Sequence, residues 1–163
     1  MTIELVEQSQ SEKLDQIRTL FREYEQFLGV SLCFQSFEEE LASLPGKYCT
    51  RQNGALFLAT ETDGKATGCV AIYQVDHNQG DVRTCELKRL FVRPEFQGRG
   101  LGRKLMGVAT AKAIDLGYHR MLLDTLARLE PACHLYRSLG FKETQPYNEN
   151  PHGDVLYFQK QIA

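Results

Sequence analysis

The sequence lacks the long apolar runs and the excess of one charge that would indicate a membrane or nucleic-acid partner. No window approaches the roughly 18 apolar residues that a membrane-spanning helix needs. Residues 1–10 contain no basic segment followed by an apolar run, so no secretory signal is indicated. Lys and Arg total 19 against 21 Asp and Glu, and the net charge of -2 offers no field that attracts nucleic acid. We therefore expect a cytoplasmic protein with no membrane and no nucleic-acid partner.

Cysteine pairs and linkers are also missing. The five cysteines are scattered and contain no Cys-x-x-Cys pair, which indicates reduced thiols. The four histidines show no ligand spacing supported by cysteines, and we expect no metal. No repeat, low-complexity tract or Pro/Gly/Ser-rich linker divides the 163 residues. Residues 1–163, with 42% apolar content, are therefore expected to form a single globular domain.

Apolar periodicity and turn signals predict two helices followed by a meander of strands. Ser9 with Glu12, and Ser36 with Glu39, match the capping box that opens a helix. The first helix is expected to end at Gly29. Its apolar stripe consists of Leu14, Ile17, Leu20, Phe21, Tyr24, Phe27 and Leu28. The strand candidates that surround and follow these helices are residues 3–6, 55–60, 66–75 and 84–92.

The apolar parity changes within the predicted central strand, residues 84–92. Cys85 and Leu87 are odd, whereas Leu90 and Val92 are even. Because strand side chains alternate between two faces, this slip indicates a β-bulge near Lys88 and Arg89 that would splay the strand from its neighbour. The remaining elements are predicted as a helix over 101–116, a strand over 121–126, a helix over 132–139 and strands over 141–144 and 155–159. This order predicts an α+β fold with a mixed, mostly antiparallel sheet.

A turn rich in glycine connects the central strand to the helix that follows it. The glycines are Gly98, Gly100 and Gly102. Backbone N–H groups at a helix N-terminus have no intrahelical partner, and glycines there allow them to approach a phosphate. A dinucleotide fingerprint does not fit, because its third glycine falls on Arg103 or Leu105. A Walker loop does not fit either, because Lys104 is not followed by Ser or Thr.

The pattern that remains, Gln97-x-x-Gly100-x-Gly102 after a strand ending at Val92, resembles the coenzyme A pyrophosphate loop of the GNAT superfamily of acyl-CoA-dependent N-acyltransferases. A second segment, residues 133–141, resembles the family's helix tyrosine followed by Gly-Phe. The resemblance covers residues 84–141. It implies a GNAT-like α+β fold, with a twisted sheet splayed at its central strand and flanked by helices on both faces. It also implies acetyl-CoA as co-substrate, bound by Leu90, Phe91, Val92, Gln97, Gly98, Arg99, Gly100, Leu101, Gly102 and Arg103.

The chemistry of acyl transfer requires a neutral amine. An alkylammonium with a pKa near 10 is only about a thousandth deprotonated at pH 7, so a base is useful. Glu86 is the candidate base, because a carboxylate on the splayed strand would point toward the slot. The alternative for Glu86 is an ordinary strand carboxylate paired with Lys88 or Arg89.

The leaving thiolate requires a donor, and Tyr136 occupies the position at which the family keeps such a tyrosine. The apolar stripe of its helix is predicted as Ala132, Leu135 and Leu139, which puts Tyr136 at the flank of that stripe. The alternative is a half-buried tyrosine with a satisfied hydroxyl. The resemblance also suggests that the backbone N–H of Val92 stabilises the oxyanion.

The acceptor is the least constrained part of the prediction. Phe34, Phe37 and residues 38–40 are expected to form one wall of its pocket and residues 147–152 another, although residues 38–40 also fit the acidic first turn of a helix. We predict an N-acetyltransferase that moves an acetyl group from acetyl-CoA to a primary amine of a small molecule by direct attack in a ternary complex. The alternatives are a protein acetyltransferase, acting on lysines or N-termini, and a non-catalytic acyl-CoA sensor. The resemblance also suggests a homodimer.

Overall fold

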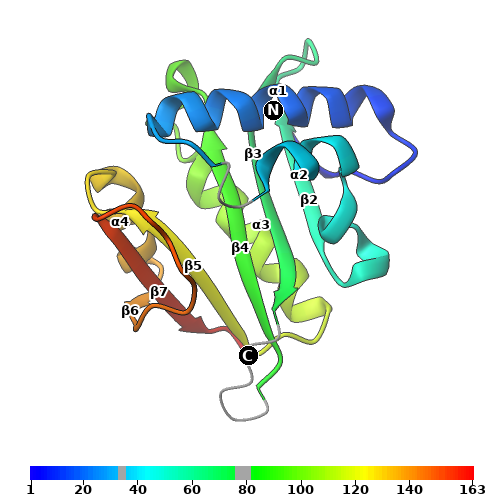
Figure 1. The fold of residues 1–163 in the computed structure, drawn as a ribbon. Helices are drawn as coiled ribbons and strands as arrows, with labels where there is room; N and C mark the ends of the chain where they lie inside the picture. Colours follow the sequence, from blue (N-terminus) through cyan, green and yellow to red (C-terminus); the bar gives the residue numbers. More distant parts are fainter. Residues whose placement is uncertain (33–35, 76–81) are drawn as a thin grey trace.

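The computed structural model describes residues 1–32, 36–75 and 82–163, and Phe34 of the expected acceptor wall lies outside these ranges. Within them, seven strands form one sheet in the order β1-β2-β3-β4-β5-β7-β6 (Figure 1). The strands are β1 (Thr2–Leu5), β2 (Ala55–Thr60), β3 (Ala66–Val75), β4 (Thr84–Val92), β5 (Arg120–Leu126), β6 (Lys142–Glu143) and β7 (Val155–Gln161). The helices are α1 (Ser11–Leu28), α2 (Phe37–Ser43), α3 (Leu101–Asp115) and α4 (Glu130–Ser138), with short 3-10 turns at Gly46–Tyr48, Thr50–Gln52 and Pro94–Phe96.

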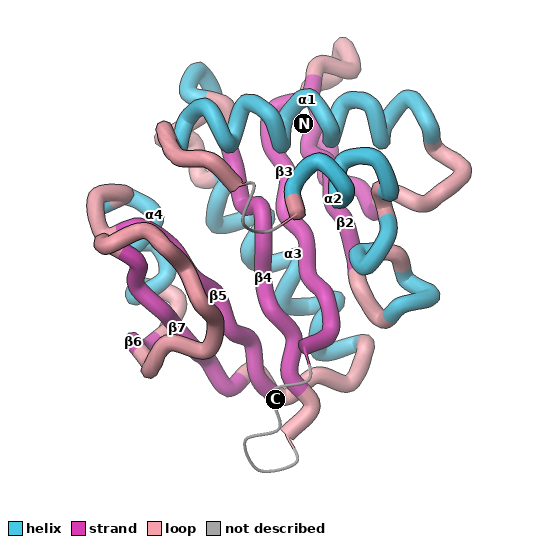
Figure 2. The backbone as a smooth tube through the Cα atoms, in the orientation of Figure 1, coloured by secondary structure: helices cyan, strands magenta, loops and turns pink. Residues whose placement is uncertain are grey.

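The sheet is covered by helices on both faces, as predicted. Strands β1 to β4 form an antiparallel meander, β4 and β5 are parallel neighbours connected through α3, and β7 pairs antiparallel with both β5 and β6. Helices α1 and α2 lie on one face, and α3 and α4 lie on the other (Figures 1 and 2). Each face has its own buried apolar cluster, so two hydrophobic layers hold the sheet between them. None of the described helices is long and apolar enough to cross a membrane.

The predicted bulge and splay are both present in β4. The β3–β4 register shifts between the pairs Cys69↔Phe91 and Ala71↔Lys88, and Arg89 adopts a left-handed φ of 60°. Strand β4 pairs with β5 only over residues 84–86, and the two strands then diverge toward α1 and α4 (Figure 1). The edge of β4 beyond Glu86 therefore has no β-ladder partner on its β5 side within the described residues.

The observed helix ends agree only in part with those predicted from the sequence. Gly29 ends α1 with a φ of 69°, and its N–H bonds the carbonyls of Glu25 and Gln26, as predicted. Both predicted capping boxes are wrong. Helix α1 begins at Ser11 after Gln10, whose side-chain oxygen accepts from the Glu7 N–H, and Ser36 has a φ of 55° and makes no side-chain cap. The motif does not determine the backbone angles on which capping depends.

Candidate active site

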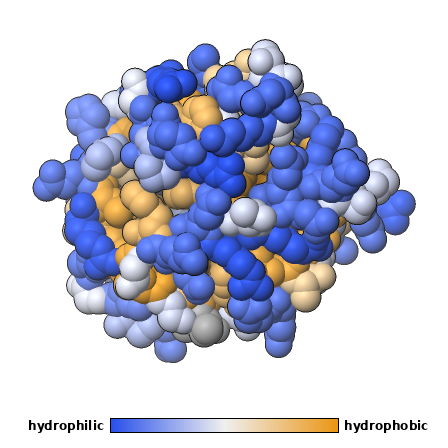
Figure 3. All heavy atoms as spheres, turned by 90° about the horizontal axis from the view of Figure 1, so that it is seen from above, coloured by the Kyte–Doolittle hydropathy of each residue, from blue (hydrophilic) through white to orange (hydrophobic). Residues whose placement is uncertain are grey.

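A cleft of about 310 Å³ opens where β4 and β5 diverge. Its walls come from the end of β4, the glycine-rich loop with the start of α3, the end of β5, α4 and the second half of α1. Seen from above, apolar surface shows among hydrophilic residues on the side of the molecule that holds α4 and β5 (Figure 3). The predicted cofactor residues that line the cleft are Leu90, Phe91, Val92, Gln97, Gly98, Gly100, Leu101, Gly102 and Arg103.

The glycine-rich loop has the geometry of an anion site. Gly98 and Gly100 have φ values of 78° and 77°, which residues with a Cβ rarely adopt, and Gly100 is the residue before α3. The N–H groups of Gly98, Arg99 and Gly100 donate to no other group in the described chain. Together with the first turn of α3, whose amides lack intrahelical acceptors, they form a set of donors at the positive end of a helix.

Side chains fix this loop beside the strand and α4. Gln97 donates from Nε2 to the Val92 carbonyl at 3.0 Å, and Arg103 donates to the Ser138 hydroxyl at 2.8 Å. A Cβ on Gly102 would lie 3.4 Å from Leu135 Cδ2, so a small residue suits the contact between α3 and α4. Arg99 is exposed, with its guanidinium over the Phe96 ring, and is not among the residues that line the cleft.

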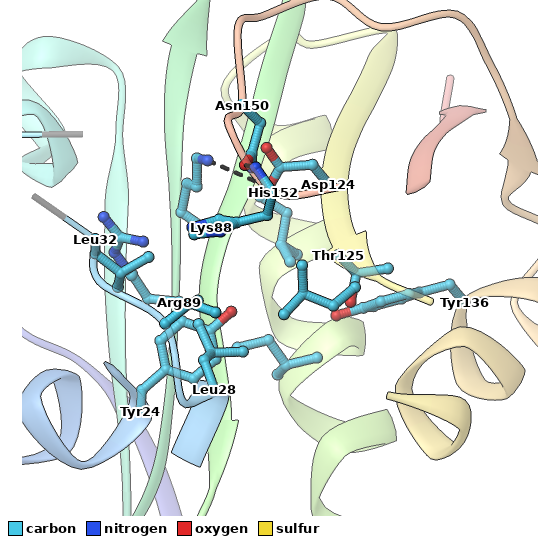
Figure 4. A pocket seen from close by; sticks show the side chains of 14 residues that line it. Tyr24, Leu28, Leu32, Lys88, Arg89, Asp124, Thr125, Tyr136, Asn150 and His152 are labelled. Atoms are coloured by element: carbon cyan, nitrogen blue, oxygen red, sulfur yellow. Dashed lines mark hydrogen bonds and ion pairs between the residues drawn. The ribbon is translucent and has the colours of Figure 1, made fainter. Parts of the chain in front are cut away.

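A second, smaller cavity of about 40 Å³ lies beside the cleft (Figure 4). Its apolar wall comes from α1 and the segment after it, and its polar wall from β4, β5 and the loop before β7. The lining includes Leu28, Val30, Leu32, Lys88, Arg89, Asp124, Asn150 and His152. Four residues line both spaces: Tyr24, Leu90, Thr125 and Tyr136. These four residues therefore mark the junction at which a molecule in the cleft would meet one in the small cavity.

Tyr136 lies on the buried face of α4, which corrects the predicted stripe. The buried residues of this helix are Cys133 and Tyr136, whereas Leu135 is half-buried because it borders the open cleft. The Tyr136 ring is 5% exposed and packs against Phe141 and Phe158 at centroid distances of 6.1 and 5.9 Å. Its hydroxyl points into the small cavity (Figure 4). Burial raises the pKa of Tyr136, so the group stays protonated and can donate at neutral pH.

The Glu86 carboxylate differs from the expectation that it points toward the slot. It is 2% exposed, and it lies 2.9 Å from Lys88 Nζ and 2.6 Å from the Tyr73 hydroxyl, while Tyr147 donates to it at 3.3 Å. Glu86 lies before the bulge, where β4 is still paired with β5, and it is not among the residues that line either space. Its ion pair with Lys88 is the alternative that the sequence left open. Whether Glu86 acts as a base stays a prediction.

Asp124 is the carboxylate that lines the small cavity, and the sequence analysis missed it. Its side chain is 11% exposed and lies 3.4 Å from Lys88 Nζ. Asn148 Nδ2 donates to its other oxygen at 3.1 Å, and the Tyr157 hydroxyl donates to Asn148 Oδ1 at 3.0 Å, which fixes the amide. Burial opposes the charge of Lys88, but Glu86 and Asp124 outweigh it and raise the pKa of the ammonium group. A lone carboxylate within the apolar strand 120–126 was the available signal.

The acidic residues of α2 do not form the expected acceptor wall. Glu40 binds the buried Arg89 guanidinium through contacts of 2.9 and 3.1 Å, and it also accepts from the Tyr48 hydroxyl at 3.0 Å. Glu38 pairs with Arg22 on the surface. Residues of the α1–α2 connection line the small cavity instead, and the loop 147–152 contributes Asn150 and His152 to the same cavity.

Comparison with known proteins gives consistent matches along the chain. Residues 14–141 match the family described as Acetyltransferase (GNAT) family. An uncharacterized N-acetyltransferase of Schizosaccharomyces pombe is 41% identical over 150 residues, which cover 92% of this chain and 89% of that protein. An uncharacterized N-acetyltransferase of Dictyostelium discoideum is 32% identical and aligns over 98% of both chains.

Solved structures share the fold at lower identity. An acetyltransferase from Streptococcus agalactiae superposes with a TM-score of 0.80 at 22% identity, over 98% of this chain and 97% of that chain. A protein of Salmonella typhimurium, solved with its cofactor acetyl-CoA, superposes with a TM-score of 0.68 at 21% identity, over 100% and 94% of the two chains. At these identities the two superpositions concern the fold alone.

Proposed function

Because this chain belongs to the acetyltransferase (GNAT) family, we propose that it transfers an acetyl group from acetyl-CoA to a primary amine of a small molecule, by direct attack in a ternary complex. One observation carries the proposal: Tyr24, Leu90, Thr125 and Tyr136 line both the large cleft and the small cavity. Two reactants held in the two spaces would meet at these residues, so no acyl group needs to be carried on the protein.

The donor half of the site would use backbone groups. The N–H groups of Gly98, Arg99 and Gly100, which donate to no other described group, suit a pyrophosphate. The edge of β4 at residues 90–92, which has no β5 partner, can pair with the amides of a pantetheine arm as an added strand would. The Val92 N–H remains the proposed donor to the thioester oxygen as negative charge develops there.

Two protons must be accounted for in the transfer. An ammonium loses one proton before it attacks, and the nitrogen loses another as the N–C bond forms and the C–S bond breaks. The first proton passes to solvent when the ammonium is neutralised. Asp124 faces the small cavity and shares Lys88 with Glu86, so this cluster is the proposed destination of the second proton, the one lost as the N–C bond forms. Tyr136, protonated and beside the cleft, would supply the proton that converts the departing thiolate into a thiol, and solvent would then restore it.

The size of the second cavity favours a small acceptor over a protein. Its free volume of about 40 Å³ is bounded on one side by the α1–α2 connection and on the other by Asn150 and His152. His152 Nε2 lies 3.4 Å from the Ser31 carbonyl, so the two walls come together. A peptide segment would have to separate these walls further than a small amine would.

The proposal is tested by measuring thiol release from acetyl-CoA against polyamines, amino acids, aminoglycosides and lysine peptides. We expect acceptor-dependent release with at least one small amine and a large loss of rate in Tyr136→Phe. Release with lysine peptides alone would replace the small-molecule acceptor by a protein. Tight acetyl-CoA binding without release for any acceptor would favour a sensor, and no binding would overturn the assignment of the Gln97 to Gly102 loop.

A further inference from the structure

A second tyrosine borders the junction of the two spaces. Tyr24 was predicted as part of the apolar stripe of α1, yet it is only half-buried and lines both the cleft and the small cavity. Its hydroxyl points across the cavity toward that of Tyr136, which comes from α4 on the opposite side (Figure 4). The junction is therefore bounded by two phenols that approach it from different helices.

Hydrogen bonding separates these two tyrosines from the others. The chain has seven tyrosines, and the structure describes all of them. Five donate their hydroxyl to another group of the chain: Tyr48, Tyr73, Tyr118, Tyr147 and Tyr157. Tyr24 and Tyr136 make no hydrogen bond with any described residue, and they are also the two that line both spaces. Neither hydroxyl is among the buried polar atoms without a partner, so both are accessible from the two spaces, and a bound reactant is placed to supply the partner.

The position of Tyr24 indicates which reactant it meets. It lies one helical turn before Leu28, which belongs to the apolar wall of the small cavity but not to the cleft. Charged groups that act on its hydroxyl are Arg89, Asp124 and Lys88, all of which line the small cavity. Burial raises the pKa of Tyr24, so the group is a neutral phenol with lone pairs that can accept a hydrogen bond.

We propose that the Tyr24 hydroxyl accepts a hydrogen bond from one N–H of the acceptor amine and so turns the nitrogen lone pair toward the thioester carbon. The inference rests on the proposed acetyl transfer and adds a residue that contacts the acceptor. In the proposed mechanism the Val92 N–H serves the thioester oxygen, Tyr136 serves the sulfur, and the Asp124 cluster takes a proton from the nitrogen. The second N–H of the amine is then the group without a positioned partner. No proton leaves Tyr24 in this step. A neutral primary amine has two N–H groups, one for the base and one for Tyr24, whereas a secondary amine has one.

The test compares primary amines with their N-methyl counterparts. Glycine is paired with sarcosine, putrescine with N,N′-dimethylputrescine, and methoxyamine with N,O-dimethylhydroxylamine, so that each methylated partner offers only secondary amines. The pair with the fastest wild-type turnover is used. Tyr24→Phe keeps the ring, so we expect the melting temperature and the Kd for acetyl-CoA to stay within experimental scatter of the wild type. We expect kcat/KM for the primary amine to fall about 5-fold to 10-fold, as for one neutral hydrogen bond, and the preference over the N-methyl amine to fall by the same factor.

Control variants separate this role from others. Tyr136→Phe should slow both amines of the pair equally, and Tyr118→Phe, which removes a hydroxyl bonded to the Asn53 carbonyl, should change neither rate. Equal losses for both amines in Tyr24→Phe, or wild-type kcat/KM in that variant, would overturn the inference while leaving the proposed function intact. Failure of the wild-type protein to acetylate any of the six amines would overturn the small-amine transfer itself, and the role of Tyr24 with it.

Discussion

Removal of the Tyr136 hydroxyl should affect catalysis and leave stability almost unchanged. In the folded chain this hydroxyl has no hydrogen-bond partner among the described residues, so Tyr136→Phe breaks no bond. The phenylalanine keeps the contacts with Phe141 and Phe158. We therefore expect the free energy of unfolding to stay within about 0.5 kcal/mol of the wild type, which is less than about 2 °C in Tm for a domain of this size.

The expected catalytic loss follows from the leaving group. General acids accelerate reactions by about 10²-fold to 10⁴-fold. A thiol has an ordinary pKa of about 8.5, so its thiolate is a good leaving group, and the expected loss of rate lies near the lower end of this range. A loss of about 100-fold in kcat corresponds to about 2.7 kcal/mol of activation free energy. The KM for acetyl-CoA should change little, because the glycine-rich loop and the edge of β4, which are proposed to hold most of acetyl-CoA, are not altered.

Tyr73→Phe is the matched control, because the same atom is removed from a hydroxyl that has a partner. Tyr73 donates to the Glu86 carboxylate at 2.6 Å, and a hydrogen bond to a charged group contributes about 2 kcal/mol, so Tm should fall by about 4 to 8 °C. Thermal unfolding and thiol release are measured on both variants. A Tyr136→Phe protein with unchanged kcat would refute the acid role of Tyr136. A Tyr136→Phe protein with a Tm lowered as far as that of Tyr73→Phe would refute the claim that the Tyr136 hydroxyl makes no stabilising hydrogen bond in the folded chain.

Three further predictions concern the carboxylates, the glycine-rich loop and alkaline pH. Asp124→Asn should lower kcat/KM for the acceptor more than Glu86→Gln does, because of these two carboxylates only Asp124 lines the small cavity. If steady-state kinetics give the reverse order, Glu86 is the base. Gly100→Ala should cost about 1 kcal/mol of stability and weaken acetyl-CoA binding, because the φ of Gly100 is 77°. Gly107 lies in the interior of α3 with open space around it, so Gly107→Ala should stabilise the protein by about 0.5 to 1 kcal/mol and leave acetyl-CoA binding unchanged. Thermal-shift titrations with acetyl-CoA measure both effects. Because burial raises the pKa of Tyr136 in the folded chain, its titration leaves stability unchanged below about pH 10, where the unfolded phenol titrates, and lowers stability as pH rises further. Urea unfolding between pH 8 and 11 should show this loss of stability only above about pH 10. A fall in the stability of the wild type below pH 10 that is absent in Tyr136→Phe would contradict the prediction.

Features that depend on residues close together in the sequence could be predicted from the sequence. The strands over 55–60, 66–75 and 84–92 agree with the structure because alternation and turn residues are local signals. The bulge near Arg89 was visible as a change of parity, and the loop at Gly98 and Gly100 was visible because only glycine readily takes the φ that both residues adopt. The capping boxes failed because a matching motif does not determine the backbone angles at Ser36.

The sequence by itself determined the order of the elements, the splay of the central strand and the glycine-rich loop, because each depends on the residue types within one short segment of the chain. Tertiary structure alone decided which side chains meet. It turned Glu86 toward Lys88 and two tyrosines, brought Asp124 to the small cavity, and set Tyr24 and Tyr136 on opposite sides of one junction. These residues lie on elements distant in the sequence, and their proximity follows from the packing of α1 and α4 on opposite faces of a sheet whose central strands part, which no local pattern encodes.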